Sequence, residues 1–230
     1  MRARPIVAID GPAGAGKSTV ARRVAESLGY VLVDTGALYR AVALSASRQG
    51  AAAGDGEVVG ALARELAANH AIVLERDAAR GVRVFLSGED VSDAIRTPQM
   101  GMDASTVSAH PPVRAALLEL QRQAGEQGGV VLEGRDIGTV VFPDAELKFF
   151  LTARPEVRAK RRFDELSAKG EAVSLAQTLA DVLRRDEQDT NRQAAPLRRA
   201  DDAEEIDSSA MSIEEAVRVV VDKARAYRAG

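Results

Sequence analysis

The 230-residue sequence contains no cysteine, which excludes disulfide bonds and thiolate metal sites formed by the chain itself. It has no apolar run as long as a membrane-spanning helix, and its first residues lack the apolar segment of a secretory signal. We therefore expect a cytoplasmic protein that does not associate with membranes. The net charge of −3 also argues against generic nucleic-acid binding, which favours a basic surface.

The rest of the composition is that of a globular protein. Hydrophobic residues make up 46% and charged residues 28%, and the chain is long enough to bury a full core as one domain. Lysine is scarce, with five copies, so arginine carries most of the positive charge. The single lysine near the N-terminus, Lys17, is therefore worth particular attention.

The stretch from Gly11 to Ser18 reads GPAGAGKS and fits the phosphate-binding pattern G-x-x-x-x-G-K-[ST] at every fixed position. A short apolar strand is predicted directly before it, and a helix directly after it. In this setting Lys17 reaches the β- and γ-phosphates of a nucleoside triphosphate, and the hydroxyl of Ser18 binds Mg²⁺. A glycine-rich connection without a ligand is the alternative. The predicted triphosphate contacts are Gly11, Pro12, Ala13, Gly14, Ala15, Gly16, Lys17, Ser18 and Thr19.

Short apolar segments alternate with helical ones along most of the chain. Strands are predicted at 6–9, 30–33, 130–132 and 147–151, with a weaker candidate at 205–207. Helices are predicted at 19–28, 37–48, 112–123, 155–168 and 175–185, and a last one follows a capping box of Ser212 and Glu215. The alternation predicts an α/β fold of the P-loop NTPase type, with a parallel five-stranded sheet flanked by helices.

One region interrupts this alternation. Apolar segments at 71–74 and 82–86 flank turn-forming residues at 76–81, which predicts a β-hairpin. We expect residues 65–106 to form a small inserted lobe on a core made of 1–64 and 107–230. The stretch 50–56, rich in alanine and glycine, is predicted to be a loop or a frayed helix end.

Charged clusters follow two of the predicted strands. Residues 34–35, Asp and Thr, can cap the next helix, and Arg40 lies one turn further on, within reach of an anion at the helix start. Capping alone would also explain the first two. The stretch 133–136 follows the predicted strand at 130–132, which places Arg135 at the same edge of the sheet as the phosphate loop. A surface ion pair is the alternative for this second cluster.

Arginine is concentrated late in the chain. Arg158, Arg161 and Arg162 share one face of a predicted helix, where their mutual repulsion favours a polyanion bound between them. A solvated basic helix, paired with Glu156 or Glu165, is the alternative.

A second charged group follows at spacings of four and three residues, which predicts one helical face carrying Arg185, Asp189 and Arg192. Asp189 could instead hold the two arginines as intrahelical pairs. His70 and His110 have no ligand-like partners in the sequence, and we expect both to be structural.

An arginine-rich site beside a phosphate loop suits transfer of a phosphoryl group to another phosphate. Two polyanions must then meet in line, and cationic side chains offset their repulsion. The acceptor needs no general base, because the second pKa of a phosphate monoester is about 6 and the group is largely deprotonated at neutral pH. The arginine helix, at 154–170, would be a lid that closes so that phosphate attacks in place of water.

Stretches along most of the chain resemble one family closely, the bacterial cytidylate kinases, which are P-loop nucleoside monophosphate kinases. They are IDGPAGAGKST at 9–19, DTGALYR at 34–40, GEDVSDAIRTP at 88–98, EGRDIGTVVFPDA at 133–145, RDEQDTNR at 185–192 and APL at 195–197. Many enzymes share the phosphate loop alone, whereas its combination with 134–139 and 185–192 is specific to this family. The resemblance implies transfer of the γ-phosphoryl group of Mg-ATP to CMP or dCMP, giving ADP and CDP or dCDP.

The resemblance also implies roles for individual residues. The cytosine-reading positions are matched by Ser105, Arg114 and Asp136, and a carboxylate is a natural acceptor for the exocyclic amino group of cytosine. Positions near the sugar are matched by Thr35, Arg185 and Asp189, and those on the acceptor phosphate by Arg40, Arg135 and Arg192. The lid arginines are matched by Arg158, Arg161 and Arg162, of which the first two are expected to contact ATP. The catalytic set implied is Lys17, Arg135, Arg158, Arg162 and Arg192.

The resemblance further assigns the inserted hairpin to a CMP-binding lobe, and we expect a monomer. The match is not uniform, because 49–69 and 201–205 carry no family pattern and many relatives have Asp at the position of Glu133. Two alternatives stay open. The first is a P-loop kinase for another nucleoside monophosphate. The second is a nucleotide-switch protein, which would need a switch segment and a partner-reading surface that the sequence does not reveal.

Overall fold

The computed structural model describes residues 2–77 and 81–227, and these fall into two compact units. The first unit is Met1–Val31 together with Gln127–Gly230, and the second is Leu32–Glu126. The predicted inserted lobe, 65–106, lies wholly within the second unit. Among the described residues, no helix is long and apolar enough to cross a membrane.

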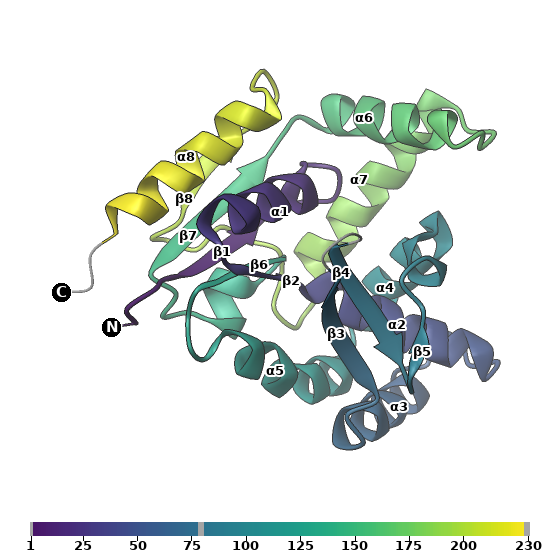
Figure 1. The fold of residues 1–230 in the computed structure, drawn as a ribbon. Coiled ribbons are helices and arrows are strands. Elements are labelled where there is room, and N and C mark those ends of the chain that lie inside the picture. The colour runs from purple at the N-terminus through teal and green to yellow at the C-terminus, as the bar shows by residue number, and fades with distance from the viewer. Residues whose placement is uncertain (1, 78–80, 228–230) are drawn as a thin grey trace. The chain divides into compact units, whose positions relative to one another are not determined.

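A five-stranded sheet has the strand order β2-β6-β1-β7-β8 (Figure 1). The central strand β1 pairs in parallel with both of its neighbours, and β7 pairs in parallel with β8. Neighbours in the sheet are far apart in sequence, so helical crossovers connect them. The strands are β1 (Ile6–Asp10), β2 (Val31–Asp34), β6 (Val130–Gly134), β7 (Leu147–Thr152) and β8 (Glu204–Asp207). The predicted α/β fold with a parallel sheet is confirmed, including its weak fifth strand.

Five helical elements belong to the first unit. They are α1 (Lys17–Leu28), the short π-helical turn η2 (Ile137–Val141), α6 (Pro155–Ala168), α7 (Leu175–Asn191) and α8 (Ile213–Ala226). Helix α1 packs on α8, and α6 packs on α7. The predicted capping box is present, because the side chain of Ser212 accepts from the N–H of Glu215 while the carboxylate of Glu215 accepts from the N–H of Ser212.

Helix α7 is longer than predicted, and Arg192 lies beyond its end. The prediction ended near Arg185, whereas the helix continues to Asn191. Arg192 has extended backbone angles, and its Nε donates to the carbonyl of Ala195 at 2.7 Å. The predicted single helical face of Arg185, Asp189 and Arg192 is therefore wrong for Arg192.

The second unit packs four helices and a small antiparallel sheet around one apolar core. Its elements are α2 (Thr35–Arg48), α3 (Gly56–Ala68), β3 (Ile72–Asp77), β4 (Gly81–Leu86), β5 (Glu89–Asp90), η1 (Ala94–Arg96), α4 (Pro98–Ser108) and α5 (Pro111–Gly125). The predicted hairpin is confirmed, with Ile72 opposite Leu86 across β3 and β4. Residues 78–80 of its predicted turn lie outside the described residues.

Two helices of this unit were not predicted. Helix α3 follows the stretch expected to be a loop, and it begins where the carboxylate of Asp55 accepts from the N–H of Val58. It buries Val59, Leu62, Ala63 and Leu66 at helical spacing. Helix α4 begins at Pro98, after Thr97 caps it. The signals of both helices are present in the sequence, but glycine in both helices and small polar residues in α4 weaken them.

Candidate active site

The phosphate loop runs from the end of β1 to the start of α1 and depends on glycine. Gly11 has a φ of +147°, and a Cβ at this position would lie 2.0 Å from the carbonyl oxygen of Leu151 on β7. Gly16 stands at the N-terminus of α1 with a φ of +92° and provides no side-chain cap. The positive end of α1 therefore faces the loop, which is the geometry of an anion site.

Lys17 and Ser18 lie at the first turn of α1. The Nζ of Lys17 donates to the carbonyl of Pro12 at 2.7 Å, and the side chain is buried. Burial, followed by the positive charge of Arg135, holds the pKa of Lys17 well below its usual range, while Glu133 opposes this effect. Ser18 donates its hydroxyl hydrogen to Oε2 of Glu133 at 2.8 Å. Bound phosphate would supply the negative charge that this buried lysine favours.

Two arginine–aspartate pairs lie beyond β6 in the same unit. Arg135 Nε is 2.7 Å from Oδ2 of Asp189, and Arg192 Nη2 is 3.5 Å from Oδ1 of Asp136. Both carboxylates are buried. Burial opposes ionisation of Asp189, but the positive charges of Arg135, Arg185 and Arg192 outweigh it and lower the pKa of Asp189 below its usual value. Asp189 of α7 thus forms an ion pair with Arg135, which follows β6, and it also interacts electrostatically with Arg185 and Arg192, which are near it in sequence.

The Arg135–Asp189 pair predicts a pH-dependent stability. Because the folded-state pKa of Asp189 is lowered, its contribution is present above the unfolded-state pKa of about 3.9 and is lost as the pH falls through the folded-state value. We expect Asp189→Asn to lower the free energy of unfolding by about 2 kcal/mol at pH 7, since it leaves buried cationic charge uncompensated. Below about pH 4 the difference from wild type should shrink.

Urea unfolding at pH 7 and at pH 3.5 measures this difference. The matched control is Asp181→Asn on the same helix, because Asp181 pairs with Arg184 where both side chains are about half exposed. The control should change stability little. A loss for Asp189→Asn that is equal at both pH values would contradict an electrostatic origin.

The three arginines of α6 have three different environments. Arg158 is buried, and its guanidinium donates to the carbonyls of Ala153 at 2.7 Å and Ala13 at 3.0 Å. It also forms a two-point ion pair with Asp186 of α7, at 2.9 and 2.5 Å. Arg158 therefore ties α6 and α7 to the phosphate loop, which is more than the sequence predicted for it.

The other two arginines of α6 are half-buried. Arg161 donates to the carbonyl oxygen of Ser208 at 2.6 Å. Arg162 pairs with Glu165 at 2.8 Å, as the alternative from the sequence had it. The predicted shared face therefore does not give these arginines a shared partner among the residues that the structure describes.

The second unit holds four of the predicted acceptor residues. The first of them, Arg40, pairs with Asp34 at 2.6 Å. Asp34 also caps α2 by accepting from the N–H of Ala37. Thr35 is buried at the start of the same helix. The other two, Ser105 and Arg114, are buried on the packed helices α4 and α5.

Arg114 is placed by contacts within this unit. Its guanidinium lies 5.5 Å from the ring centroid of Tyr39 and donates to the carbonyl of Ser108 at 3.3 Å. His110 lies 3.0 Å from the carbonyl oxygen of Ala53 through Nε2, a contact that joins two segments of this unit. That contact fits the structural role predicted for His110.

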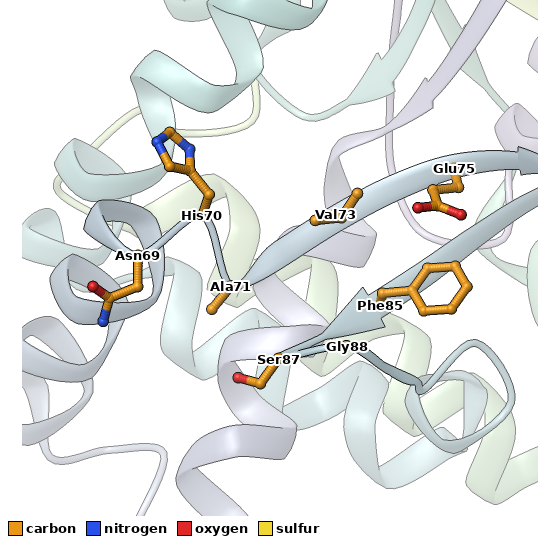
Figure 2. Close-up of a pocket in the computed structure, with 8 residues that line it drawn as sticks. All are labelled: Asn69, His70, Ala71, Val73, Glu75, Phe85, Ser87 and Gly88. Carbon is orange, nitrogen blue, oxygen red and sulfur yellow. The ribbon is translucent and has the colours of Figure 1, made fainter.

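A cavity of about 560 Å³ lies against the β3–β4 hairpin (Figure 2). Val73 and Phe85, which face each other across the hairpin, give it apolar walls, and Glu75 also lines it. An acidic side chain disfavours a phosphate group. We therefore assign no nucleotide phosphate to this cavity.

Sequence reasoning missed three acidic residues of the first unit. Asp10, Glu133 and Asp186 all lie inside recognised motifs, but none of them was given a partner. All three are partners of loop or helix groups far away in sequence. Only the position of Asp10 and Glu133 at the carboxyl ends of adjacent strands could have indicated them.

Comparisons with known proteins identify the family. The family described as Cytidylate kinase matches residues 7–226. A cytidylate kinase of Geobacter sp. (strain M21) is 54% identical over 94% of this chain and 90% of its own length, and one of Pelotomaculum thermopropionicum is 50% identical over 99% of both. A solved structure of an uncharacterized protein from Eubacterium ventriosum, 14% identical, covers 97% of this chain and 99% of its own with a TM-score of 0.51, and this likeness concerns the fold alone. The chain therefore belongs to the cytidylate kinase family, whose members are ATP-dependent phosphotransferases.

Proposed function

We propose a division of roles among the side chains of this enzyme, which transfers the γ-phosphoryl group of ATP to CMP or dCMP and releases ADP with CDP or dCDP. The observation that carries the proposal is the buried Lys17 at the start of α1, in the same unit as the Arg135–Asp189 and Arg192–Asp136 pairs. A phosphate loop binds the donor, and cations with buried counter-charges are suited to the acceptor phosphate.

The reaction itself asks little covalent chemistry of the protein. An oxygen of the acceptor phosphate forms a bond to the γ-phosphorus of ATP while the bond to the β–γ bridging oxygen breaks, and ADP leaves with that electron pair. The acceptor monoester is largely deprotonated at neutral pH, so no side chain has to remove a proton. Lys17, Arg135 and Arg192 neutralise the phosphates, and the amides at 11–19 hold the triphosphate in line.

A Mg²⁺ ion fits the donor side of this site. Ser18 and Glu133 bring a hydroxyl and a carboxylate oxygen within 2.8 Å of each other at the phosphate loop. Within residues 2–77 and 81–227 no three His, Cys, Asp or Glu side chains gather as a metal cage would, and Mg²⁺ is commonly bound by one or two protein oxygens plus phosphates and waters. When bound, the ion would screen the charge of the β- and γ-phosphates.

The acceptor contacts follow the family positions. Asp136, Arg114 and Ser105 read the cytosine base, where a carboxylate accepts from the exocyclic amino group and the other two donate to N3 and O2. The sugar is assigned to Thr35, Arg185 and Asp189, and the phosphate to Arg40, Arg135 and Arg192. Hydrogen bonds of this kind select cytosine over other bases, because another base would leave buried polar groups of the site without a hydrogen-bond partner.

The arginines of α6 are suited to two roles in the predicted lid at 154–170, which are holding the phosphate loop and contacting phosphate. Arg158 touches the phosphate loop through the carbonyl of Ala13, so it can hold the loop in place around ATP. Arg162 is held by a partly exposed pair with Glu165, which is worth little and is easily exchanged for a phosphate contact. Arg161 completes the ATP-facing set. A monomeric state, a cytoplasmic location and a CMP-binding role for 65–106 stay predictions.

The test of the proposed reaction is ADP release from Mg-ATP with CMP, dCMP, UMP, AMP and GMP supplied one at a time. We expect fast turnover with CMP and dCMP and rates lower by at least about a hundredfold with the other three. Equal or faster turnover with another monophosphate would keep phosphoryl transfer but overturn the base assignment. Failure of all five acceptors to stimulate ADP release would overturn the proposed reaction.

A further inference from the structure

Asp10 is the last residue of β1, directly before the phosphate loop, and its carboxylate is buried. Its Oδ1 accepts from the N–H of Ile137 and its Oδ2 accepts from the N–H of Gly138, both at 2.8 Å. These two amides are the first to follow Asp136 in the chain. The carboxylate therefore clamps the acceptor loop at the point where it leaves Asp136.

The clamp supplies a cap that the loop does not provide for itself. The turn η2 begins at Ile137, and its leading N–H groups have no partner earlier in the turn. The carbonyl of Asp136 accepts from Val140 and Val141, but the side chain of Asp136 does not cap the turn. Asp10 caps the turn instead, so the carboxylate of Asp136 is available for other contacts, such as the one with Arg192 at 3.5 Å.

Close packing at Gly138 also holds the same turn. A Cβ added at Gly138 would lie 3.1 Å from Cδ and 3.3 Å from Cγ of Lys148, and 3.5 Å from Oδ2 of Asp10. Lys148 is itself fixed, because its Nζ donates to the carbonyl of Pro143 at 2.6 Å and to Asp202 at 2.7 Å. Gly138 thus packs closely against two side chains from the neighbouring strands β1 and β7, which leave little room for an added methyl group.

The two loops that meet at Asp10 are held in different ways. The backbone of Asp10 is part of the sheet, opposite Gly134 on β6 and Phe150 on β7, and the ladder fixes the start of the phosphate loop whatever the side chain is. The turn at 137–141 is outside the ladder. Among the described residues, the hydrogen bonds that join it to β1 are accepted by the carboxylate of Asp10, so loss of the side chain should move the turn rather than the phosphate loop.

The charged groups that face Asp10 are Asp136 and Lys17, with Arg135 also within its field. Burial raises the pKa of Asp10 to about 6, against the lowering effect of the two amides and of Lys17. At neutral pH the group is therefore largely ionised, and the two hydrogen bonds it accepts are then charge-assisted.

We propose that Asp10 is a positioning residue for the acceptor nucleotide, which sets Arg135 and Asp136 through the amides of Ile137 and Gly138 without touching either substrate. This inference rests on the proposed roles of Arg135 and Asp136. It connects the strand that carries the ATP-binding loop to the loop that selects the base.

The experiment compares wild type with Asp10→Asn in steady-state kinetics and in direct titration of Mg-ATP without acceptor. The amide replaces one acceptor oxygen with an NH₂ group that faces a backbone N–H, so one bond becomes a repulsion. We expect KM for CMP to rise by about tenfold or more and the preference for CMP over UMP to fall by a similar factor. The dissociation constant of Mg-ATP should change by less than about threefold, since the ladder holds the phosphate loop.

The matched control is Glu146→Gln. The carboxylate of Glu146 accepts from the N–H of Ile6 at 2.9 Å, a partly buried bond of the same kind at the opposite end of β1. This variant should lower the melting temperature without changing KM for CMP. A second variant, Gly138→Ala, moves the same turn by a methyl group and should raise KM for CMP more mildly; it decides the question if Asp10→Asn does not fold.

The outcomes separate the two proposals. Wild type that fails to phosphorylate CMP overturns the proposed function itself. Active wild type, together with a folded Asp10→Asn variant that keeps KM and base preference, overturns the positioning role. An equal loss of ATP and CMP affinity also overturns it, because that result indicates general destabilisation of β1.

Discussion

Lys17→Ala is expected to lower kcat for CMP phosphorylation by at least about a thousandfold. The side chain is buried beside the phosphate loop, with its Nζ held on the carbonyl of Pro12. Burial and the positive charge of Arg135 lower the pKa of Lys17 and so disfavour its charged form. An anion bound beside Lys17 would stabilise that charged form. On the proposed mechanism that anion is the transferring phosphoryl group, and the arginines assigned to the acceptor phosphate do not replace a cation on the donor side of the site.

Alanine at this position should fold, because it removes a buried cation that pays a desolvation penalty. The assay is ADP release at saturating ATP and CMP, with the melting temperature measured in parallel. Lys223→Ala is the control, since Lys223 is an exposed lysine of α8 whose side chain pairs with Glu204. Near-normal turnover in the folded Lys17→Ala variant would refute the role assigned to this lysine.

The parts of the fold that were predictable are those determined by neighbours in sequence. The phosphate loop is a contiguous pattern, and its glycines are required by positive φ values and by the approach of Gly11 to Leu151. The capping box of α8 is likewise a relation between residues three apart. Helix α3 is the exception, because its apolar spacing is regular but Gly56 and Gly60 lower its helix propensity.

The parts that could not be predicted depend on contacts between distant segments. Intrahelical pairing was one of the two interpretations of Asp189 that the sequence allowed, whereas its carboxylate also pairs with Arg135, 54 positions away in the chain. The amides that Asp10 holds lie 127 and 128 positions away. Local spacing rules describe pairs of side chains on one helix, each of which stabilises the helix by about a few tenths of a kcal/mol. They carry no information on which strand ends lie next to each other in a sheet. The topology of the sheet has to be known before such partners can be named.

Asp136 is the residue whose replacement should change base selection most. We expect Asp136→Ala to lower kcat/KM for CMP by about a hundredfold or more, because the exocyclic amino group of cytosine loses its acceptor in a buried site. The rate with UMP should not rise, since alanine offers no donor to the O4 of uracil. The ratio of kcat/KM for CMP to that for UMP is the quantity to measure, with dCMP as a third acceptor.

Asp136→Asn distinguishes base reading from a general charge effect. Both variants remove the negative charge that lies 3.5 Å from Arg192, so any disturbance of the acceptor phosphate is common to the two and cancels in the ratio of CMP to UMP. Asparagine, unlike alanine, can turn its NH₂ group towards O4 of uracil and donate. We therefore expect Asp136→Asn to lose activity with CMP and to gain activity with UMP relative to Asp136→Ala. If the two variants show the same ratio, Asp136 acts on the acceptor through its charge beside Arg192 and not through the base.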